Sequence, residues 1–323
     1  MSRALVARAP TRIDFGGGWT DVPPYSTEQG GAVCNIAIAR YATASAAIGA
    51  PDAPHDAELA TATPLIAAVL RRAALPGASA TIRSDFPVGS GLGGSSAAGV
   101  ALAGALATLA GASTEPATLA ELSRATEVEE LGVAGGFQDH YAAAYGGALL
   151  LTFEGCVGVE HVALTPDICD ALARRALLIY TGESRISSAT IDAVLDAYRR
   201  RDTRVCEALA RMKALAGDMA AALRGGDLDA LGALLGEHWS QQRALHPSIT
   251  TPRIDAIMTA ATRSGALGGK ALGASGGGCV VVMAADGREA ELAAALAPLG
   301  ERLEYTVDEQ GFQVVAALAG ADA

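Results

Sequence analysis

A glycine- and serine-rich segment, residues 87–98 (PVGSGLGGSSAA), is the strongest chemical signal in the sequence. Its four glycines let the backbone approach a ligand without interference from Cβ atoms. The helix expected to follow would present unpaired N–H groups and the positive end of its dipole, which suit a phosphate. Ser95 and Ser96 could cap that helix or offer an oxygen to a phosphate or a magnesium ion. The spacing matches neither a P-loop nor a dinucleotide-binding loop, so the segment alone predicts either a phosphate-binding loop or a tight turn with a serine cap.

Three further segments hold the other chemical candidates: residues 9–25 (APTRIDFGGGWTDVPPY), 127–141 (EVEELGVAGGFQDHY) and 265–279 (GALGGKALGASGGGC). Phosphoryl transfer needs a carboxylate at the acceptor oxygen and cations on the phosphates. Arg12 stays protonated, so it can neutralise charge but cannot act as a base. The carboxylates of 127–141 could instead form a solvated helix face or a helix cap.

The segments 9–25, 87–98 and 265–279, in this order, resemble the three signature motifs of the galactokinase, homoserine kinase, mevalonate kinase and phosphomevalonate kinase superfamily. The resemblance implies an α+β fold of two domains. Residues 1–165 would form an ATP-binding domain similar to domain 2 of ribosomal protein S5, and residues 166–323 a ferredoxin-like domain. ATP and Mg²⁺, the implied cofactors, would meet a small-molecule sugar or sugar phosphate in the cleft between them.

The resemblance also implies a role for individual residues. Asp139, which follows a glycine pair, would be the catalytic carboxylate, and Arg12 would stabilise it and the phosphoryl group in transit. Ser96 and Glu127 would hold the magnesium ion, with Glu129 as the alternative to Glu127. The ATP phosphates would be bound by the loop residues Pro87, Gly89, Ser90, Gly91, Leu92, Gly93, Gly94, Ser95 and Ser96.

A third group of residues would bind the substrate. Asp21 matches an acidic residue that holds sugar hydroxyls. Arg185 could grip a substrate phosphate with two hydrogen bonds, although a surface arginine is an equally simple interpretation. Galactose is disfavoured because Gly18 and Trp19 stand where galactokinases carry a glutamate and a histidine. The remaining expected substrate contacts are Trp19, Tyr25, Gly136, Gly276 and Gly277.

Within the superfamily, the chain is most similar to kinases of D-glycero-α-D-manno-heptose 7-phosphate, which phosphorylate the anomeric hydroxyl. The shared stretches are Asp21 to Tyr25 and residues 135–139, 141–147, 180–185 and 265–270. Residues 17–25 are closer to L-fucokinases, and His140 stands where both groups usually have glutamine. We therefore expect an enzyme, a sugar 1-kinase, with heptose 7-phosphate as the leading acceptor. L-Fucose or another free sugar is the alternative, and a non-catalytic sugar sensor on the same fold is a less favoured one.

Strands and helices mixed along the whole chain must position these residues, which fits an α+β fold. Strand patterns cover residues 5–9, 32–44, 80–84, 147–153, 159–164, 177–180, 279–283, 303–306 and 312–318. Helical patterns cover residues 96–109, 117–130, 187–223, 228–245, 251–263 and 288–297. The change from mixed to helix-rich sequence places the domain boundary between Phe153 and Arg175.

Composition and charge exclude further functional classes of protein. The 323 residues carry a formal net charge of −11, which argues against nucleic-acid binding. The longest apolar run, residues 97–112, falls short of the roughly 18–20 residues of a spanning helix, so no membrane partner is expected. Five cysteines without a C-x-x-C pair and an N-terminus without a signal-peptide pattern indicate a cytoplasmic protein. The sequence does not distinguish a monomer from a homodimer.

Overall fold

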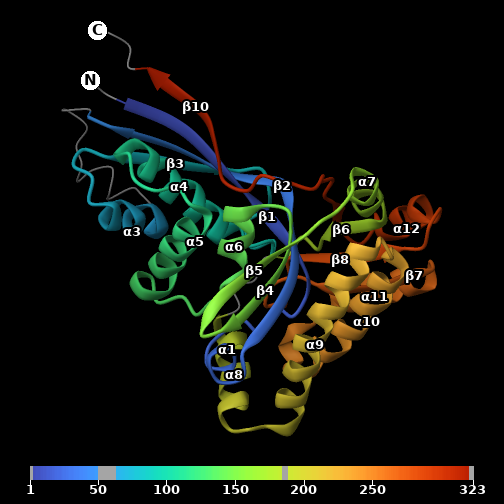
Figure 1. Cartoon of the computed structure of the whole chain (residues 1–323). Helices are drawn as coiled ribbons and strands as arrows, with labels where there is room; N and C mark the ends of the chain where they lie inside the picture. Colours follow the sequence, from blue (N-terminus) through green and yellow to red (C-terminus); the bar gives the residue numbers. More distant parts are fainter. Residues whose placement is uncertain (1–2, 50–62, 184–187, 320–323) are drawn as a thin grey trace.

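Two antiparallel sheets form the frame of the protein (Figure 1). The computed structural model describes residues 3–49, 63–183 and 188–319. The first sheet has the order β10-β1-β2-β4-β5 with β3 paired to β2, and the second has the order β7-β8-β6-β9. The strands of the first sheet are β1 (Arg3–Gly16), β2 (Gly31–Ile48), β3 (Ser79–Ser84), β4 (Ala148–Glu154), β5 (Cys156–Val162) and β10 (Gln313–Ala319). Those of the second are β6 (Ala176–Tyr180), β7 (Ala266–Ala271), β8 (Cys279–Ala284) and β9 (Glu301–Arg302).

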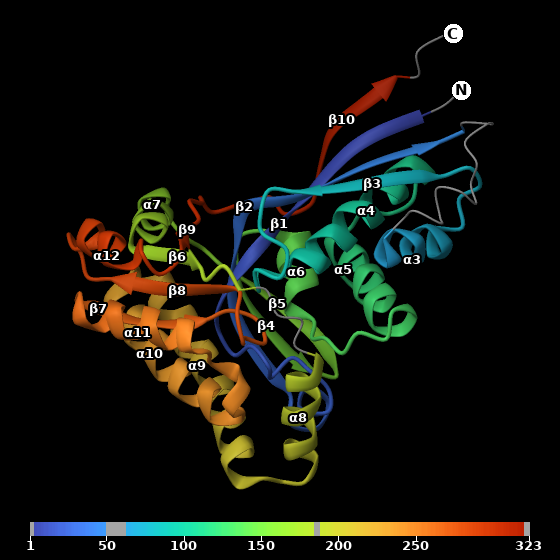
Figure 2. The same ribbon diagram turned by 180° about the vertical axis from the view of Figure 1, so that it is seen from behind.

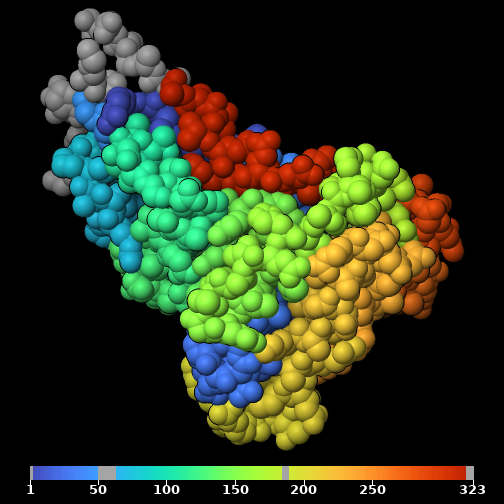
Figure 3. Space-filling model, viewed as in Figure 1, coloured from blue at the N-terminus to red at the C-terminus, as the bar shows by residue number. Residues whose placement is uncertain are grey.

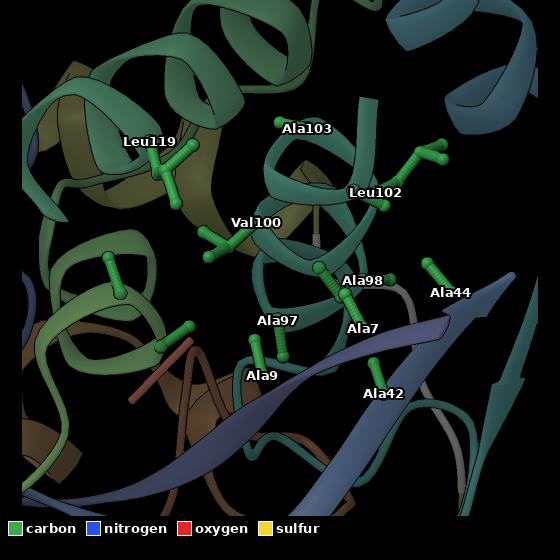
Figure 4. Close-up of a cluster of buried hydrophobic side chains, with 14 of the residues drawn as sticks. Ala7, Ala9, Ala42, Ala44, Ala97, Ala98, Val100, Leu102, Ala103 and Leu119 are labelled. Atoms are coloured by element: carbon green, nitrogen blue, oxygen red, sulfur yellow. The ribbon is translucent and has the colours of Figure 1, made fainter. Parts of the chain in front are cut away.

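Helices cover both faces of the first sheet, because its strands are apolar on both sides (Figures 1 and 2). On one face Ala97 and Val100 of α4 pack against Ala7 and Ala9 of β1 (Figure 4). These small side chains let the helix lie close to the strands. The helices of this part are α1 (Tyr25–Gln29), α3 (Pro64–Ala73), α4 (Gly94–Ala110), α5 (Pro116–Ala125) and α6 (Gln138–Tyr145).

In the second half of the chain, helices form a layer that packs on the second sheet. Helices α9 and α10 contact each other, and α10 lies on β7 while α9 reaches across to β1 and β2. One core cluster contains Ile13 and Phe15 of the first sheet together with Leu231 and Val281 of the second half, so the two parts share apolar packing. The helices are α7 (Pro166–Arg175), α8 (Ser188–Arg199), α9 (Thr203–Gly225), α10 (Leu228–Leu245), α11 (Pro252–Arg263) and α12 (Glu289–Leu296).

The last strand, β10, returns to the first sheet and pairs antiparallel with β1 from Arg3↔Ala319 to Arg8↔Gln313. In the space-filling view this segment, drawn in red, runs across the surface to the N-terminal strands (Figure 3). The two-domain fold class is confirmed. The division of the chain at residue 165 stays a prediction. Strand β10, at the C-terminal end of the chain, belongs to the first sheet, whose other strands all come before that residue.

Several expected elements differ from the structure. The single helix expected over residues 187–223 is wrong: α8 and α9 are separate, because Arg201 adopts a φ of 58° and Asp202 caps α9 by accepting a hydrogen bond from Val205 N. The strand expected near 303–306 is displaced: β9 is Glu301–Arg302, while Leu303 N still donates to Leu178 O at 2.9 Å. Helices α1, α3, α6 and α7 and strand β7 were not expected at all. Among the described residues, no helix is long and apolar enough to cross a bilayer.

Candidate active site

A pocket of about 490 Å³ opens between β1, the 84–96 loop, the first turn of α4, the start of α6 and the 273–274 turn. Most of the residues that the sequence singled out line it. Eight of the nine expected loop residues do so, and only Leu92 does not. The Leu92 side chain is fully buried in the core, while its carbonyl accepts a hydrogen bond from Arg12 N at 3.0 Å.

A β-bulge aims β1 at this pocket. The pairing of β1 with β2 shifts register between Pro10 and Thr11. Before the bulge, Ala7 and Ala9 face the α4 side, whereas after it Ile13 faces the opposite side. Side chains alternate along a strand, so the bulge turns Arg12, and with it Asp14, toward α6 and the pocket.

Arg12 and Asp139, which the sequence predicted to form the reaction centre, are in direct contact. Arg12 Nε donates to Asp139 Oδ1 at 2.8 Å, and Arg12 Nη2 lies 2.6 Å from the same oxygen. Arg12 Nη1 donates to Gly91 O at 2.7 Å, which ties the carboxylate to the loop. Asp139 lies in the first turn of α6 and makes no capping hydrogen bond, so the alternative of a helix cap is wrong. Both guanidinium contacts use Oδ1, which leaves Oδ2 for a ligand.

The glycine-rich loop passes close to this carboxylate. A Cβ on Gly93 would lie 3.0 Å from Asp139 Cγ, and Gly93 has a φ of +74°, so a larger residue there would meet both strain and contact. Gly93 is also the N-cap of α4, and no side chain caps the helix. The first N–H groups of α4 therefore face the pocket without a side-chain acceptor, as an anion site requires.

Ser96, Glu127 and His140 form a second polar group beside the loop. Ser96 Oγ donates to Glu127 Oε2 at 3.2 Å, and His140 Nε2 lies 3.1 Å from Glu127 Oε2 and 3.3 Å from Ser96 Oγ. Burial raises the pKa of Glu127, but the hydrogen bond and charge of His140, with hydrogen bonds from Ser95 and Ser96, leave it below its ordinary value. Glu127 thus presents a carboxylate to the pocket.

The local fold favours Glu127 over Glu129. The α-helix expected over residues 117–130 ends at Ala125 and widens into a π-helical turn, Thr126–Glu130. On this turn Glu129 points away and pairs with Arg72 at 3.1 Å. Ser96 and Glu127 provide two oxygen ligands of the kind magnesium prefers, and a nucleotide's phosphates and water would supply the others. No group of three or more His, Cys, Asp and Glu side chains suited to a metal occurs in the described residues.

Asp21 forms the wall opposite Ser96. Its Oδ2 accepts hydrogen bonds from Phe137 N at 2.9 Å and Gln138 N at 3.0 Å, at the start of α6. Burial raises the pKa of Asp21 to about 6, with the charges of Asp139 and Asp14 adding to it against the two backbone hydrogen bonds. A Cβ on Gly136 would lie 1.9 Å from Asp21 Oδ2, so glycine is required there. Trp19, Asp21 and Gly136 all line the pocket as expected.

Three expected substrate contacts do not line the pocket. Tyr25 is buried and packs edge-on against Tyr198, with ring centroids 5.4 Å apart. Gly276 donates from its backbone to Ile249 O, and a Cβ on Gly277 would lie 2.7 Å from Glu183 O. These three residues are packed against protein instead. Arg185 lies outside the described residues.

Sequence reasoning missed a buried ion pair beside the pocket. Lys270 Nζ lies 2.8 Å from Asp14 Oδ2 and also donates to Asp14 O at 3.0 Å. Burial raises the pKa of Asp14, but the charges of Lys270, His238 and Arg12, with the hydrogen bond from Lys270, together hold it below its ordinary value. The available signals were the rarity of lysine and the position of Asp14 two residues after Arg12, which puts both on one face of β1.

Comparisons with known proteins find a matching family and similar sequences. Residues 60–147 match the GHMP kinases N terminal domain, and residues 219–297 match the GHMP kinases C terminal domain. A Mycobacterium tuberculosis galactokinase is 31% identical over 68% of this chain and 68% of its own length. A Campylobacter jejuni D-glycero-alpha-D-manno-heptose 7-phosphate kinase is 30% identical over 60% of this chain and 58% of its own.

Two longer comparisons cover nearly the whole chain. The L-fucokinase/L-fucose-1-P guanylyltransferase of Bacteroides fragilis is 28% identical over 95% of this chain, which spans only 38% of that relative's length. The crystal structure of a D-glycero-D-manno-heptose 1-phosphate kinase from Bacteroides thetaiotaomicron superposes with a TM-score of 0.78 at 26% identity, covering 99% of this chain and 100% of the other. The fold and the family motifs are thus shared along the chain.

Proposed function

This chain belongs to the GHMP kinases, and from that premise we propose that it transfers the γ-phosphoryl group of ATP to the anomeric hydroxyl group of a sugar. The observation that carries the proposal is the Arg12–Asp139 pair held against the glycine-rich loop. A carboxylate and a permanent cation meet there at the end of a loop and helix suited to a triphosphate.

The triphosphate would lie along residues 87–96, with backbone N–H groups of the loop and of the first turn of α4 donating to its oxygens. Ser96 Oγ and Glu127 Oε2 would hold Mg²⁺ from the side of the pocket nearest His140. When bound, the metal would neutralise charge on the phosphates. The hydrogen bond between Ser96 Oγ and Glu127 Oε2 fixes the positions of the two oxygens that would hold the metal.

Asp139 would orient the acceptor hydroxyl through Oδ2 and take its proton as the oxygen–phosphorus bond forms. The bond between the γ-phosphorus and the bridging oxygen breaks, and ADP leaves with that electron pair. Arg12 remains protonated throughout, holds the Asp139 carboxylate in position and lies where it can neutralise charge on the phosphoryl group in transit. Asp21, on the opposite wall, would accept hydrogen bonds from sugar hydroxyls.

The acceptor that we favour is D-glycero-α-D-manno-heptose 7-phosphate, phosphorylated at its anomeric hydroxyl to the 1,7-bisphosphate. L-Fucose is the second candidate, because a fucokinase relative matches 95% of this chain. A sensor that binds a sugar without turnover is the third. The expected cytoplasmic location suits a reaction that consumes ATP.

A panel of free and phosphorylated sugars, incubated with ATP and Mg²⁺, tests this proposal. ADP release is followed by a coupled assay, and phosphorus NMR locates the new phosphate. Asp139→Asn serves as the matched control because it removes the proposed base and keeps the side-chain shape. Phosphate at the anomeric oxygen of one sugar supports the proposal. Sugar binding without ADP release would favour the sensor, and phosphate on another hydroxyl would contradict the 1-kinase assignment.

A further inference from the structure

Three buried polar atoms of residues that line the pocket have no hydrogen-bond partner among the described residues: Asp14 Oδ1, Gln138 Oε1 and Trp19 Nε1. Their residues are only 3%, 7% and 8% exposed, respectively. Buried polar groups in folded proteins are nearly always paired, because an unpaired one loses its hydration without compensation. Seven other buried atoms of the described residues also have no partner, so what distinguishes these three is that their residues line the pocket, where a bound ligand would supply partners.

Asp14 and Gln138 are neighbours in space, and all three residues line the same pocket. A Cβ on Gly18 would lie 2.2 Å from Asp14 Oδ2 and 3.0 Å from Gln138 Nε2, so the carboxylate and the amide both lie beside the Gly18 Cα. Trp19 follows Gly18 directly. Gln138 precedes Asp139, and Asp14 follows Arg12 by two positions on β1, so this cluster adjoins the proposed reaction centre.

Two features hold these groups in place: an ion pair at Asp14 and a strained backbone at Trp19. Lys270 Nζ donates hydrogen bonds to Asp14 Oδ2 and to the Asp14 carbonyl oxygen. These bonds fix the carboxylate and leave its Oδ1 available. Trp19 has a φ of 80°, a region that bulky residues rarely adopt. Backbone strain of this kind concentrates at ligand sites, where the surrounding structure maintains it.

The chemistry of the three atoms defines the ligand. A carboxylate oxygen and an amide oxygen accept hydrogen bonds, and the indole N–H donates one. A sugar hydroxyl both donates and accepts, so two adjacent hydroxyls satisfy the set. A phosphate dianion has no proton to donate and would repel Asp14.

We propose that Asp14, Gln138 and Trp19 form a subsite for two neighbouring, unphosphorylated hydroxyl groups of the acceptor sugar. This inference rests on the proposed sugar-kinase function and adds which part of the substrate lies beside the reaction centre. Any phosphate carried by the acceptor must then lie away from these three residues. Lys270 acts as a positioning residue, since it holds Asp14 rather than touching the sugar.

The test measures sugar binding without ATP, by ligand-observed NMR titration. The probes are D-mannose and L-fucose, each with its 2-, 3- and 4-deoxy derivatives. Gln138→Met and Trp19→Phe remove one hydrogen-bonding group each and leave the Asp14–Lys270 pair intact. We expect each variant to raise the Kd of the parent sugar about 3- to 10-fold, the scale of one neutral hydrogen bond. A deoxy sugar that lacks the recognised hydroxyl should bind weakly to the wild type and no more weakly to the variant.

Trp239→Phe is the matched control, because Trp239 Nε1 is also buried without a partner but lies outside this pocket. Asp14→Asn should raise the Kd of the parent sugar about 10-fold or more. Because this change leaves the buried Lys270 without its carboxylate partner, thermal unfolding checks that the variant is folded. Equal losses for parent and deoxy sugars, or no loss in Gln138→Met and Trp19→Phe, would overturn the subsite. Normal hydroxyl-dependent binding with no phosphorylation of any sugar would instead reject the kinase function and leave the subsite standing.

Discussion

Replacing Asp21 with asparagine should stabilise the protein at neutral pH while weakening substrate binding. Asp21 is 2% exposed, and its Oδ2 accepts two backbone hydrogen bonds at the start of α6. An asparagine oxygen can accept the same two bonds without placing a charge in the buried wall. The wild-type carboxylate is therefore kept at the expense of stability, as is common for groups that bind a ligand.

The magnitude follows from the pKa of Asp21, which burial raises from 3.8 to about 6. The folded protein then binds a proton at Asp21 more tightly than the unfolded chain does. The contribution of Asp21 to stability is complete below pH 3.8 and is lost as the pH rises through about 6. A difference of this size corresponds to about 3 kcal/mol at pH 7.5. The advantage of Asp21→Asn should grow from near zero at pH 3.8 to its full value above pH 6.

Urea unfolding of the wild type and Asp21→Asn at pH 4, 5, 6 and 7.5 measures this difference directly. The exposed Asp218 supplies the control variant Asp218→Asn, whose difference from wild type should vary little across the same range. The KM for the sugar should rise in Asp21→Asn, whereas the KM for ATP should change little. An Asp21→Asn variant less stable than wild type at pH 7.5, or a difference independent of pH, would refute the reasoning.

Four further predictions concern the other site residues. Asp139→Asn should lower kcat about 10²–10⁴-fold while a nucleotide titration stays unchanged, and near-normal turnover would make Asp139 structural. Ser96→Ala should weaken Mn²⁺ binding, followed by electron paramagnetic resonance with ATP present, because it removes one oxygen ligand; an effect in Ser95→Ala alone would move the ligand to Ser95. His140→Ala should raise the Mn²⁺ Kd about 10-fold or more, because His140 contacts both Ser96 and Glu127, and His140→Gln should restore most of the affinity; an unchanged Kd in His140→Ala would contradict this role. Arg185→Ala should raise the KM for a phosphorylated sugar about 10- to 100-fold and leave the KM for a free sugar and for ATP nearly unchanged, so equal effects on both sugars would remove Arg185 from phosphate binding.

Local signals predicted many of the elements that build the site. Glycines followed by a long apolar run predicted the loop and α4, and the break at residues 225–227 separated α9 from α10. Local pattern failed where packing decides the outcome. The helical composition of 187–223 runs through the turn at Arg201. The strand-like residues 303–306 divide their backbone hydrogen bonds between two sheets, at Leu178 of β6 and Ala39 of β2, so that only Glu301–Arg302 form a strand.

Contacts between residues far apart in the sequence explain another group of wrong predictions. Tyr25 belongs to the same segment as Asp21, yet its ring packs on Tyr198, which comes 173 positions later. Gly276 and Gly277 belong to a segment near the pocket, but they serve close backbone contacts with residues 183 and 249. Membership in a motif did not distinguish a residue that faces the ligand from one that packs behind it.

The sequence by itself predicted a glycine-rich loop before a helix, from residue type and short spacing, and the family resemblance of its motifs added the expected roles of Arg12, Asp139, Ser96 and Glu127. Tertiary structure decided which side chains meet. The pairing of β1 with β2 shifts register after Pro10, and Lys270 reaches Asp14 from 256 positions away. Neither the register shift nor that pairing has a local signal, since both are fixed by how the two sheets pack together. The unpartnered atoms of Asp14, Gln138 and Trp19 became visible only once that packing had removed them from water.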